Sequence, residues 1–171
     1  MKFLRFALLL FLTASVNAQP GNQKWRIATD QELKSLIPAR ATVEKERIET
    51  EFRTASGVTD GNGRFIAGVV MITAGYSAEG KYSHFFITHV AIKCGEVNLR
   101  PGEYVFGYKR TAEDTLEVKF YEASTGKFLG DVRAAIDNRR GRIRSLAITP
   151  PGAEKATVRI GRFFFEYSIG G

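Results

Sequence analysis

The sequence contains few of the residues that cross-link chains or bind metals. It has one cysteine and two histidines in 171 residues. A single cysteine cannot form an intramolecular disulfide, so a disulfide framework is excluded. The two histidines, His84 and His89, are five positions apart, and this odd spacing places them on opposite faces of a regular strand. We therefore predict no metal site and no cofactor.

Long hydrophobic runs are also missing. No apolar stretch approaches the roughly 20 residues that a membrane-spanning helix needs, so we expect no transmembrane segment in the mature chain. The apolar residues 6–12 follow a short basic start and precede residues 16–18 (VNA), a pattern typical of a cleaved signal peptide. We expect a signal peptide over residues 1–18, a single β domain over residues 19–171, and a periplasmic or extracellular location. No cysteine lies near the expected cleavage site, which excludes a lipoprotein anchor.

Short motifs of hydrolases are absent as well. The sequence contains no Gly-x-Ser-x-Gly and no His-Glu-x-x-His. Cys94 lies before Gly95 at the end of an expected strand, and a nucleophilic thiol would need a nearby base and electropositive surroundings. A lone thiol in an exported protein is usually buried and inert. We assign no catalytic residue.

Positive charge exceeds negative charge, with a formal net charge of +7 at pH 7. For an exported protein, the anionic bacterial surface and acidic polysaccharides are natural counter-charges. Arg140, Arg142 and Arg144 would share one strand face and could hold a carboxylate or sulfate. The alternative is a charged face that protects an edge strand. No aromatic residue interrupts these arginines, so we expect no nucleic-acid binding.

The chain alternates between strand patterns and turn signals. The motif Asp60-Gly61-Asn62-Gly63 is a strong turn signal, and residues 115–121 alternate between apolar and polar. This pattern predicts a mainly β fold, an antiparallel β-barrel or β-sandwich of about eight strands. The expected strands are residues 48–53, 64–73, 82–92, 103–109, 115–121, 128–136, 142–148 and 157–169.

One short N-terminal helix is expected over residues 30–37. Thr29 and Glu32 form a capping box, in which each side chain can bond to the backbone of the other residue. Pro38 ends the helix, because proline has no amide hydrogen and disfavours a helical residue before it.

Three of the expected strands are apolar on both faces. These runs are residues 69–72, 85–87 and 163–165. In a sheet with one solvent-exposed face, the residues of each strand would alternate between apolar and polar. Both faces of these strands must therefore be covered. The N-terminal helix, a second sheet or a partner subunit could cover them. The last possibility makes a structural homo-oligomer one candidate function.

Aromatic residues form the most suggestive group. Tyr104, Phe106 and Tyr108 share one face of one expected strand, and Tyr82 would share the face of His84. Rings with hydroxyl tips can line an apolar cavity or stack on sugars, although core packing is the ordinary alternative. The candidate ligand-binding residues are Tyr82, His84, Tyr104, Phe106, Tyr108 and Tyr121.

These patterns favour a non-catalytic binding module of the bacterial cell envelope. Its ligand would be a small apolar or carbohydrate molecule bound at the aromatic strand and the turns beside it. A hydrolytic enzyme with His84 or a carboxylate in a cleft is the first alternative. A structural subunit of a homo-oligomer is the second.

Overall fold

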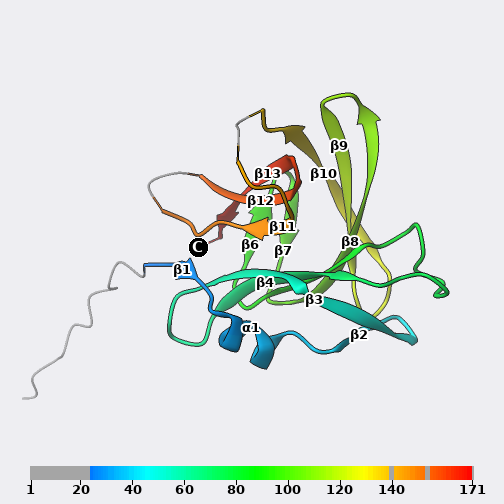
Figure 1. Cartoon of the computed structure of the whole chain (residues 1–171), viewed down its shortest axis with the longest axis horizontal. Helices are drawn as coiled ribbons and strands as arrows, with labels where there is room; N and C mark the ends of the chain where they lie inside the picture. Colours follow the sequence, from blue (N-terminus) through cyan, green and yellow to red (C-terminus); the bar gives the residue numbers. More distant parts are fainter. Residues whose placement is uncertain (1–23, 139–140, 153–154, 171) are drawn as a thin grey trace, which may run out of the picture.

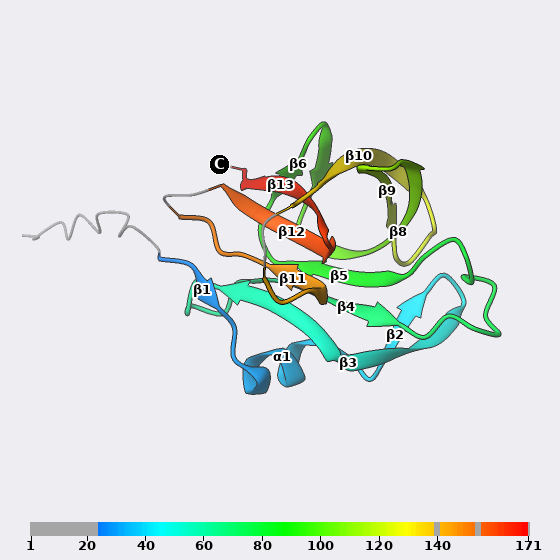
Figure 2. The same cartoon turned by 45° about the horizontal axis from the view of Figure 1, so that its top comes forward.

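The computed structural model describes residues 24–138, 141–152 and 155–170. The expected signal peptide, residues 1–18, and Arg140 lie outside these residues. The described part forms an antiparallel sheet that is nearly closed into a barrel, with one short helix at its N-terminal side (Figures 1 and 2). The predicted mainly β class with one N-terminal helix is confirmed.

The described part contains more strands than the sequence pattern indicates. In chain order the elements are β1 (Arg26–Ile27), α1 (Asp30–Leu36), β2 (Arg40–Val43), β3 (Glu46–Thr59), β4 (Phe65–Met71), β5 (His84–Thr88), β6 (Ile92–Cys94), β7 (Val97–Leu99), β8 (Gly102–Ala112), β9 (Thr115–Glu122), β10 (Phe128–Ile136), β11 (Arg144–Ile148), β12 (Ala156–Gly161) and β13 (Phe163–Ile169). The number of strands is 13, against an expected eight.

Two of the additional strands come from local turns inside stretches expected to be continuous. After β5, the Thr88 hydroxyl donates to the Val90 carbonyl, and the chain then enters the hairpin of β6 and β7. Gly161 has a φ of 61°, and the register pairs Ile160 with Phe163. Gly161 and Arg162 therefore make a two-residue turn that separates β12 from β13, because glycine adopts this left-handed conformation without strain.

The sheet order explains the near closure of the barrel. The strands run in the order β1-β3-β4-β5-β8-β9-β10-β13-β12-β11, with β2 beside β3 and the β6–β7 hairpin beside β13. The strand at the end of this order, β11, lies beside β3, and the amide of Ile148 there donates to Ser56 Oγ over 2.9 Å. This contact joins the two ends of the sheet, and we call the line between β11 and β3 the seam.

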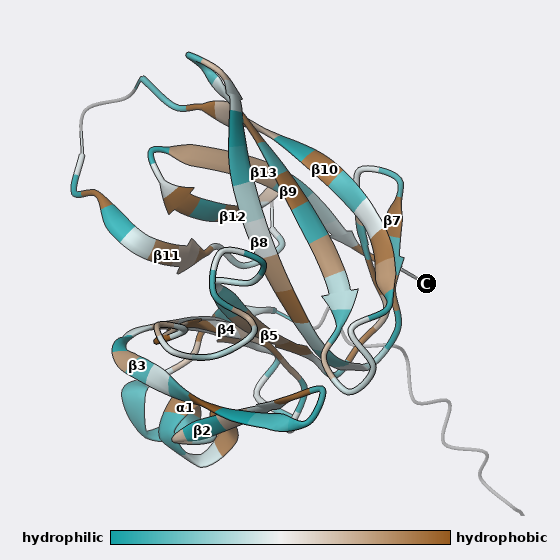
Figure 3. Ribbon diagram, turned by 90° about the vertical axis from the view of Figure 1, so that its right-hand side faces the viewer, coloured by the Kyte–Doolittle hydropathy of each residue, from teal (hydrophilic) through white to brown (hydrophobic). Residues whose placement is uncertain are grey.

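Aromatic rings fill the inside of the barrel. The rings of Phe106 and Phe120 are 5.4 Å apart between centroids, and those of Phe120 and Phe165 are 5.8 Å apart. Phe86 packs edge-on against the same group. Each of these buried rings contributes roughly 1.5–3 kcal/mol to folding through removal of apolar surface from water. Figure 3 shows the matching alternation of hydrophobic and hydrophilic residues along β9 and β10.

A second apolar cluster covers the outer face of β4 and β5. Leu33 of α1 and Ile48 of β3 are buried there with Val69 of β4 and Phe85 of β5. Figures 1 and 2 show α1 and β2 on this side of the sheet. The chain itself therefore covers both faces of these strands, and their pattern needs no partner subunit.

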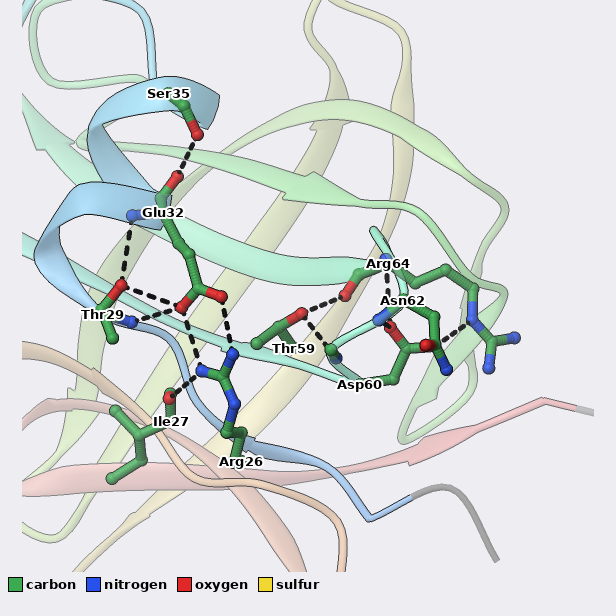
Figure 4. A network of polar contacts seen from close by, with 10 residues as sticks. Arg26, Ile27, Thr29, Glu32, Ser35, Thr59, Asp60, Asn62 and Arg64 are labelled. Atoms are coloured by element: carbon green, nitrogen blue, oxygen red, sulfur yellow. Dashed lines mark hydrogen bonds and ion pairs between the residues drawn. The ribbon is translucent and has the colours of Figure 1, made fainter. Parts of the chain in front are cut away.

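The N-terminal helix is fixed by polar contacts at its start (Figure 4). The Glu32 amide donates to Thr29 Oγ1, and Glu32 Oε2 accepts from the Thr29 amide over 2.8 Å, so the predicted capping box is present. Arg26 also holds the Glu32 carboxylate, at 2.7 and 2.9 Å. These contacts lower the pKa of Glu32 to about 2, chiefly through the hydrogen bond from Arg26.

Candidate functional site

The six candidate ligand-binding residues lie on both faces of the sheet. His84 stacks on Phe106 in the barrel, with ring centroids 4.6 Å apart and planes 8° from parallel. Tyr82 and Tyr121 meet in the outer cluster, with ring centroids 5.0 Å apart. The expectation that Tyr82 shares the face of His84 is wrong. Strand alternation fails there because β5 begins at His84 and Tyr82 still belongs to the preceding loop.

The two remaining tyrosines differ in exposure. Tyr104 is only 8% exposed, and its hydroxyl donates to the Arg100 carbonyl over 2.7 Å. Tyr108, on the same face of β8, is 48% exposed, and its ring lies 6.0 Å from that of His84. The strand therefore presents one ring to solvent, while Tyr104 and Phe106 belong to the core.

His84 has part of the geometry of a catalytic base. Its Nδ1 lies 2.8 Å from the hydroxyl oxygen of Ser83, but its buried Nε2 has no hydrogen-bond partner. Burial lowers the pKa of His84 to about 4. A serine–histidine pair acts as nucleophile and base when a third group orients the imidazole, and no described residue does so here.

Cys94 and His89 do not add to a reactive centre. Cys94 is fully buried, and burial raises the pKa of its thiol to about 12. His89 is exposed, with its Nδ1 3.1 Å from the Gly63 carbonyl oxygen. Among the described residues, no three histidine, cysteine, aspartate or glutamate side chains are grouped so that they could hold a metal ion.

A groove on the outer face is lined by Tyr121. Tyr108 also borders it from β8, but the Tyr108 ring itself lies on the barrel side, 6.0 Å from the ring of His84. The volume of the groove is about 450 Å³. We call it the tyrosine–lysine groove. It is lined by Glu79, Gly80, Lys81, Gly107, Tyr108, Lys109, Glu117, Lys119 and Tyr121.

Lys81 is held in place at one side of this groove. Its Nζ lies 4.7 Å from the centre of the Tyr82 ring and 5.5 Å from that of Tyr121. The same Nζ is 3.3 Å from Glu44 Oε1, which also accepts from the Tyr82 hydroxyl over 2.7 Å. These hydrogen bonds, first from Tyr82 and then from Lys81, lower the pKa of Glu44.

The network depends on two unusual backbone positions. Glu44 has a φ of 53°, which is rare for a residue with a side chain, and its amide donates to the Ala123 carbonyl over 2.7 Å. At Gly107 an added Cβ would lie 2.1 Å from the carbonyl oxygen of Lys81. The loop before β5 can therefore lie directly on β8 because position 107 has no side chain. The sequence pattern did not predict either contact, because both join segments far apart in the chain.

The predicted arginine group lies elsewhere on the surface. Arg142 and Arg144 line one cleft, while Arg140 lies outside the described residues. Arg142 precedes β11, which begins at Arg144, so a loop brings these two side chains together rather than strand alternation.

Comparison with known protein families, with curated proteins and with solved structures finds no match to this chain. In the part of the chain that the structure describes, no helix has both the length and the apolar character needed to cross a bilayer.

Proposed function

We propose that the protein is an exported, non-catalytic binding module of the bacterial cell envelope, and that its tyrosine–lysine groove binds a sugar-like ligand. The observation that carries this proposal is the placement of Tyr121 in one open groove together with lysine and glutamate side chains, with Tyr108 at its border. Support for export comes from the pattern of residues 1–18.

The chemistry of the groove suits a molecule with an apolar face and many hydroxyl groups. Aromatic rings pack on the C–H face of a sugar, and their phenolic tips remain available for hydrogen bonds. Lysine ammonium groups donate and glutamate carboxylates accept, so a sugar hydroxyl finds partners of both kinds. The groove is lined by three lysines and two glutamates, so its positive and negative charges nearly balance. This balance favours a polar ligand of low charge. The residues are Lys81, Lys109, Lys119, Glu79 and Glu117.

The groove is also partly organised before any ligand arrives. Glu44, which also accepts from Tyr82, holds Lys81 beside the rings of Tyr82 and Tyr121, and of these two rings Tyr121 lines the groove. A side chain already held in its binding conformation loses less entropy on association, which improves affinity.

Two other interpretations receive less support. Phe86, Phe106, Phe120 and Phe165 pack together inside the barrel, which argues against a small apolar ligand enclosed there. Catalysis would rest on the contact between Ser83 and His84. Burial of the imidazole and its lowered pKa oppose that role near neutral pH.

The proposal can be tested by NMR titration of the protein with neutral mono- and oligosaccharides. We expect amide shifts at Gly80 and Gly107, and loss of binding in Tyr121→Ala. Tyr76→Ala is the matched control, because Tyr76, like Tyr121, packs partly buried against the outer cluster but does not line the groove. Shifts that appear elsewhere, or equal losses in both variants, would contradict the proposal.

A further inference from the structure

Four arginines from separate segments surround one cleft of about 590 Å³. Arg142 belongs to the loop before β11, Arg144 begins β11, Arg159 lies in β12, and Arg162 occupies the turn between β12 and β13. We call this site the arginine cleft. We propose that it binds an acidic polysaccharide, a ligand class different from that of the tyrosine–lysine groove and independent of it.

One of the four guanidinium groups is held rigidly. Arg159 Nη1 lies 2.5 Å from Asp137 Oδ2, and its guanidinium lies 5.3 Å from the centre of the Phe164 ring. Only 24% of the Arg159 side chain is exposed. A guanidinium fixed in this way presents its remaining N–H groups in a defined direction, which suits bidentate recognition of a carboxylate or sulfate.

The other three guanidinium groups have no such partner. The side chains of Arg142, Arg144 and Arg162 make no hydrogen bond or ion pair within the part of the chain that the structure describes. All three are exposed. Like charges placed close together repel one another, and the single carboxylate of Asp137 is already engaged with Arg159. Anionic groups of a ligand would relieve this repulsion.

The basic surface extends beyond the cleft. A second, smaller groove of about 220 Å³ shares Arg142, Ile143 and Arg144 with the cleft and adds Arg53 of β3. Basic groups therefore continue from the turn between β12 and β13, past β11, to the opposite side of the seam. A single small anion would occupy only part of this surface, whereas a polymer with repeated anionic groups can contact all of it.

The remaining lining residues indicate which kind of polymer fits. They are aliphatic, small or polar, and no aromatic side chain lines either groove among the described residues. Single-stranded nucleic acids are usually bound by aromatic rings that stack on the bases. Ile143 is 54% exposed between the arginines and offers an apolar contact for a saccharide ring. The surface therefore fits an acidic polysaccharide better than a nucleic acid.

Binding can be measured by fluorescence anisotropy with labelled oligomers of polygalacturonate and of dextran sulfate. Inorganic phosphate, neutral dextran and a single-stranded oligonucleotide are the comparison ligands. We expect affinity for the acidic oligomers to rise with chain length and to fall as salt increases, because ion pairs form at several arginines. Neutral dextran should not bind at the cleft.

The variant Arg142→Gln/Arg144→Gln should weaken binding of the acidic oligomers at least tenfold. Its matched control is Arg47→Gln/Arg133→Gln, which removes the same charge from two exposed arginines outside both grooves. Thermal unfolding of both variants would show that the fold is retained.

Three results would overturn the inference. The first is an equal loss in both variants, which would indicate non-specific attraction to a basic protein. The second is tighter binding of the oligonucleotide than of the acidic oligomers. The third is saturation by inorganic phosphate with no gain from chain length. None of these results bears on the neutral sugars used to test the tyrosine–lysine groove.

Discussion

Tyr82 donates its phenolic hydroxyl to Glu44 Oε1 over 2.7 Å and so joins the loop before β5 to the turn between β2 and β3. The same carboxylate oxygen receives Lys81, and the backbone of Glu44 bonds to Ala123 after β9. One glutamate in a left-handed conformation thus connects three segments around the tyrosine–lysine groove.

Removing the Tyr82 hydroxyl should loosen this connection. We expect Tyr82→Phe to lower the free energy of unfolding by about 1 kcal/mol, the usual net contribution of one hydrogen bond, and to raise the pKa of Glu44 toward its ordinary value. Urea denaturation and NMR titration of Glu44 measure the two effects. In the control, Tyr76→Phe, the hydroxyl removed makes no hydrogen bond within the described part, and stability should stay unchanged.

Adding one methyl group to β8 should displace the loop that lines the groove. In Gly107→Ala the new Cβ would collide with the Lys81 carbonyl oxygen, a backbone atom that cannot simply rotate away. We expect a loss of about 1–3 kcal/mol in the free energy of unfolding, typical of overpacking. Gly152→Ala has open space around the added methyl group and should be nearly neutral. Equal stability of the two variants would refute the close approach at Gly107.

His84 should make the protein less stable in mild acid. Its pKa of about 4 lies below the value of 6.5 expected in the unfolded chain, so between these pH values the unfolded state binds a proton that the folded state does not. Stability therefore falls as the pH decreases from 6.5 toward 4, by about 3 kcal/mol in total from this one group.

This contribution can be isolated by comparing variants. In His84→Phe the free energy of unfolding should lose that part of its pH dependence, while His89→Gln should keep the profile of the unmodified protein. Chemical denaturation at several pH values between 4 and 7 provides the measurement. Identical profiles for all three proteins would show that His84 is not buried in its neutral form.

The Cys94 thiol should be unreactive in the folded protein. It is buried, and its pKa of about 12 leaves very little thiolate at pH 8. We expect Ellman's reagent to modify the protein rapidly in denaturant and very slowly in buffer. Fast modification in buffer would contradict the position of Cys94 in the core.

Local signals in the sequence predicted the elements that local contacts define. The Thr29–Glu32 capping box and the turn at residues 60–63 depend on residues a few positions apart, and both are present. The alternation of residues 115–121 reappears as β9, with its apolar side in the barrel.

Features that depend on distant contacts were missed. The prediction of the sheet face on which Tyr82 lies was wrong because β5 starts two residues later, at His84. This strand boundary is set by pairing with β4 and β8. The turn at Gly161 and Arg162 is a local feature that was also missed, because a single glycine marks it within a stretch rich in strand-forming residues. Arg159 and Arg162 lie near Arg142 and Arg144 because β12 pairs with β11, a pairing in which Arg144 lies opposite Gly161.

The seam is the junction of the barrel that hydrogen bonds join least among the described residues. Among the described residues, the amide of Ile148 and the hydroxyl of Ser56 supply the hydrogen bond that crosses it, whereas every other neighbouring pair on the path is joined by a ladder of backbone bonds. Separation of β11 from β3 would break no strand ladder, but it would expose Leu146 and Ile148, which are buried in the barrel core. Arg53 and Arg144 lie on opposite sides of the seam. A rigid anionic ligand bound to both would therefore hold β11 against β3, so its binding would be coupled to the width of the barrel.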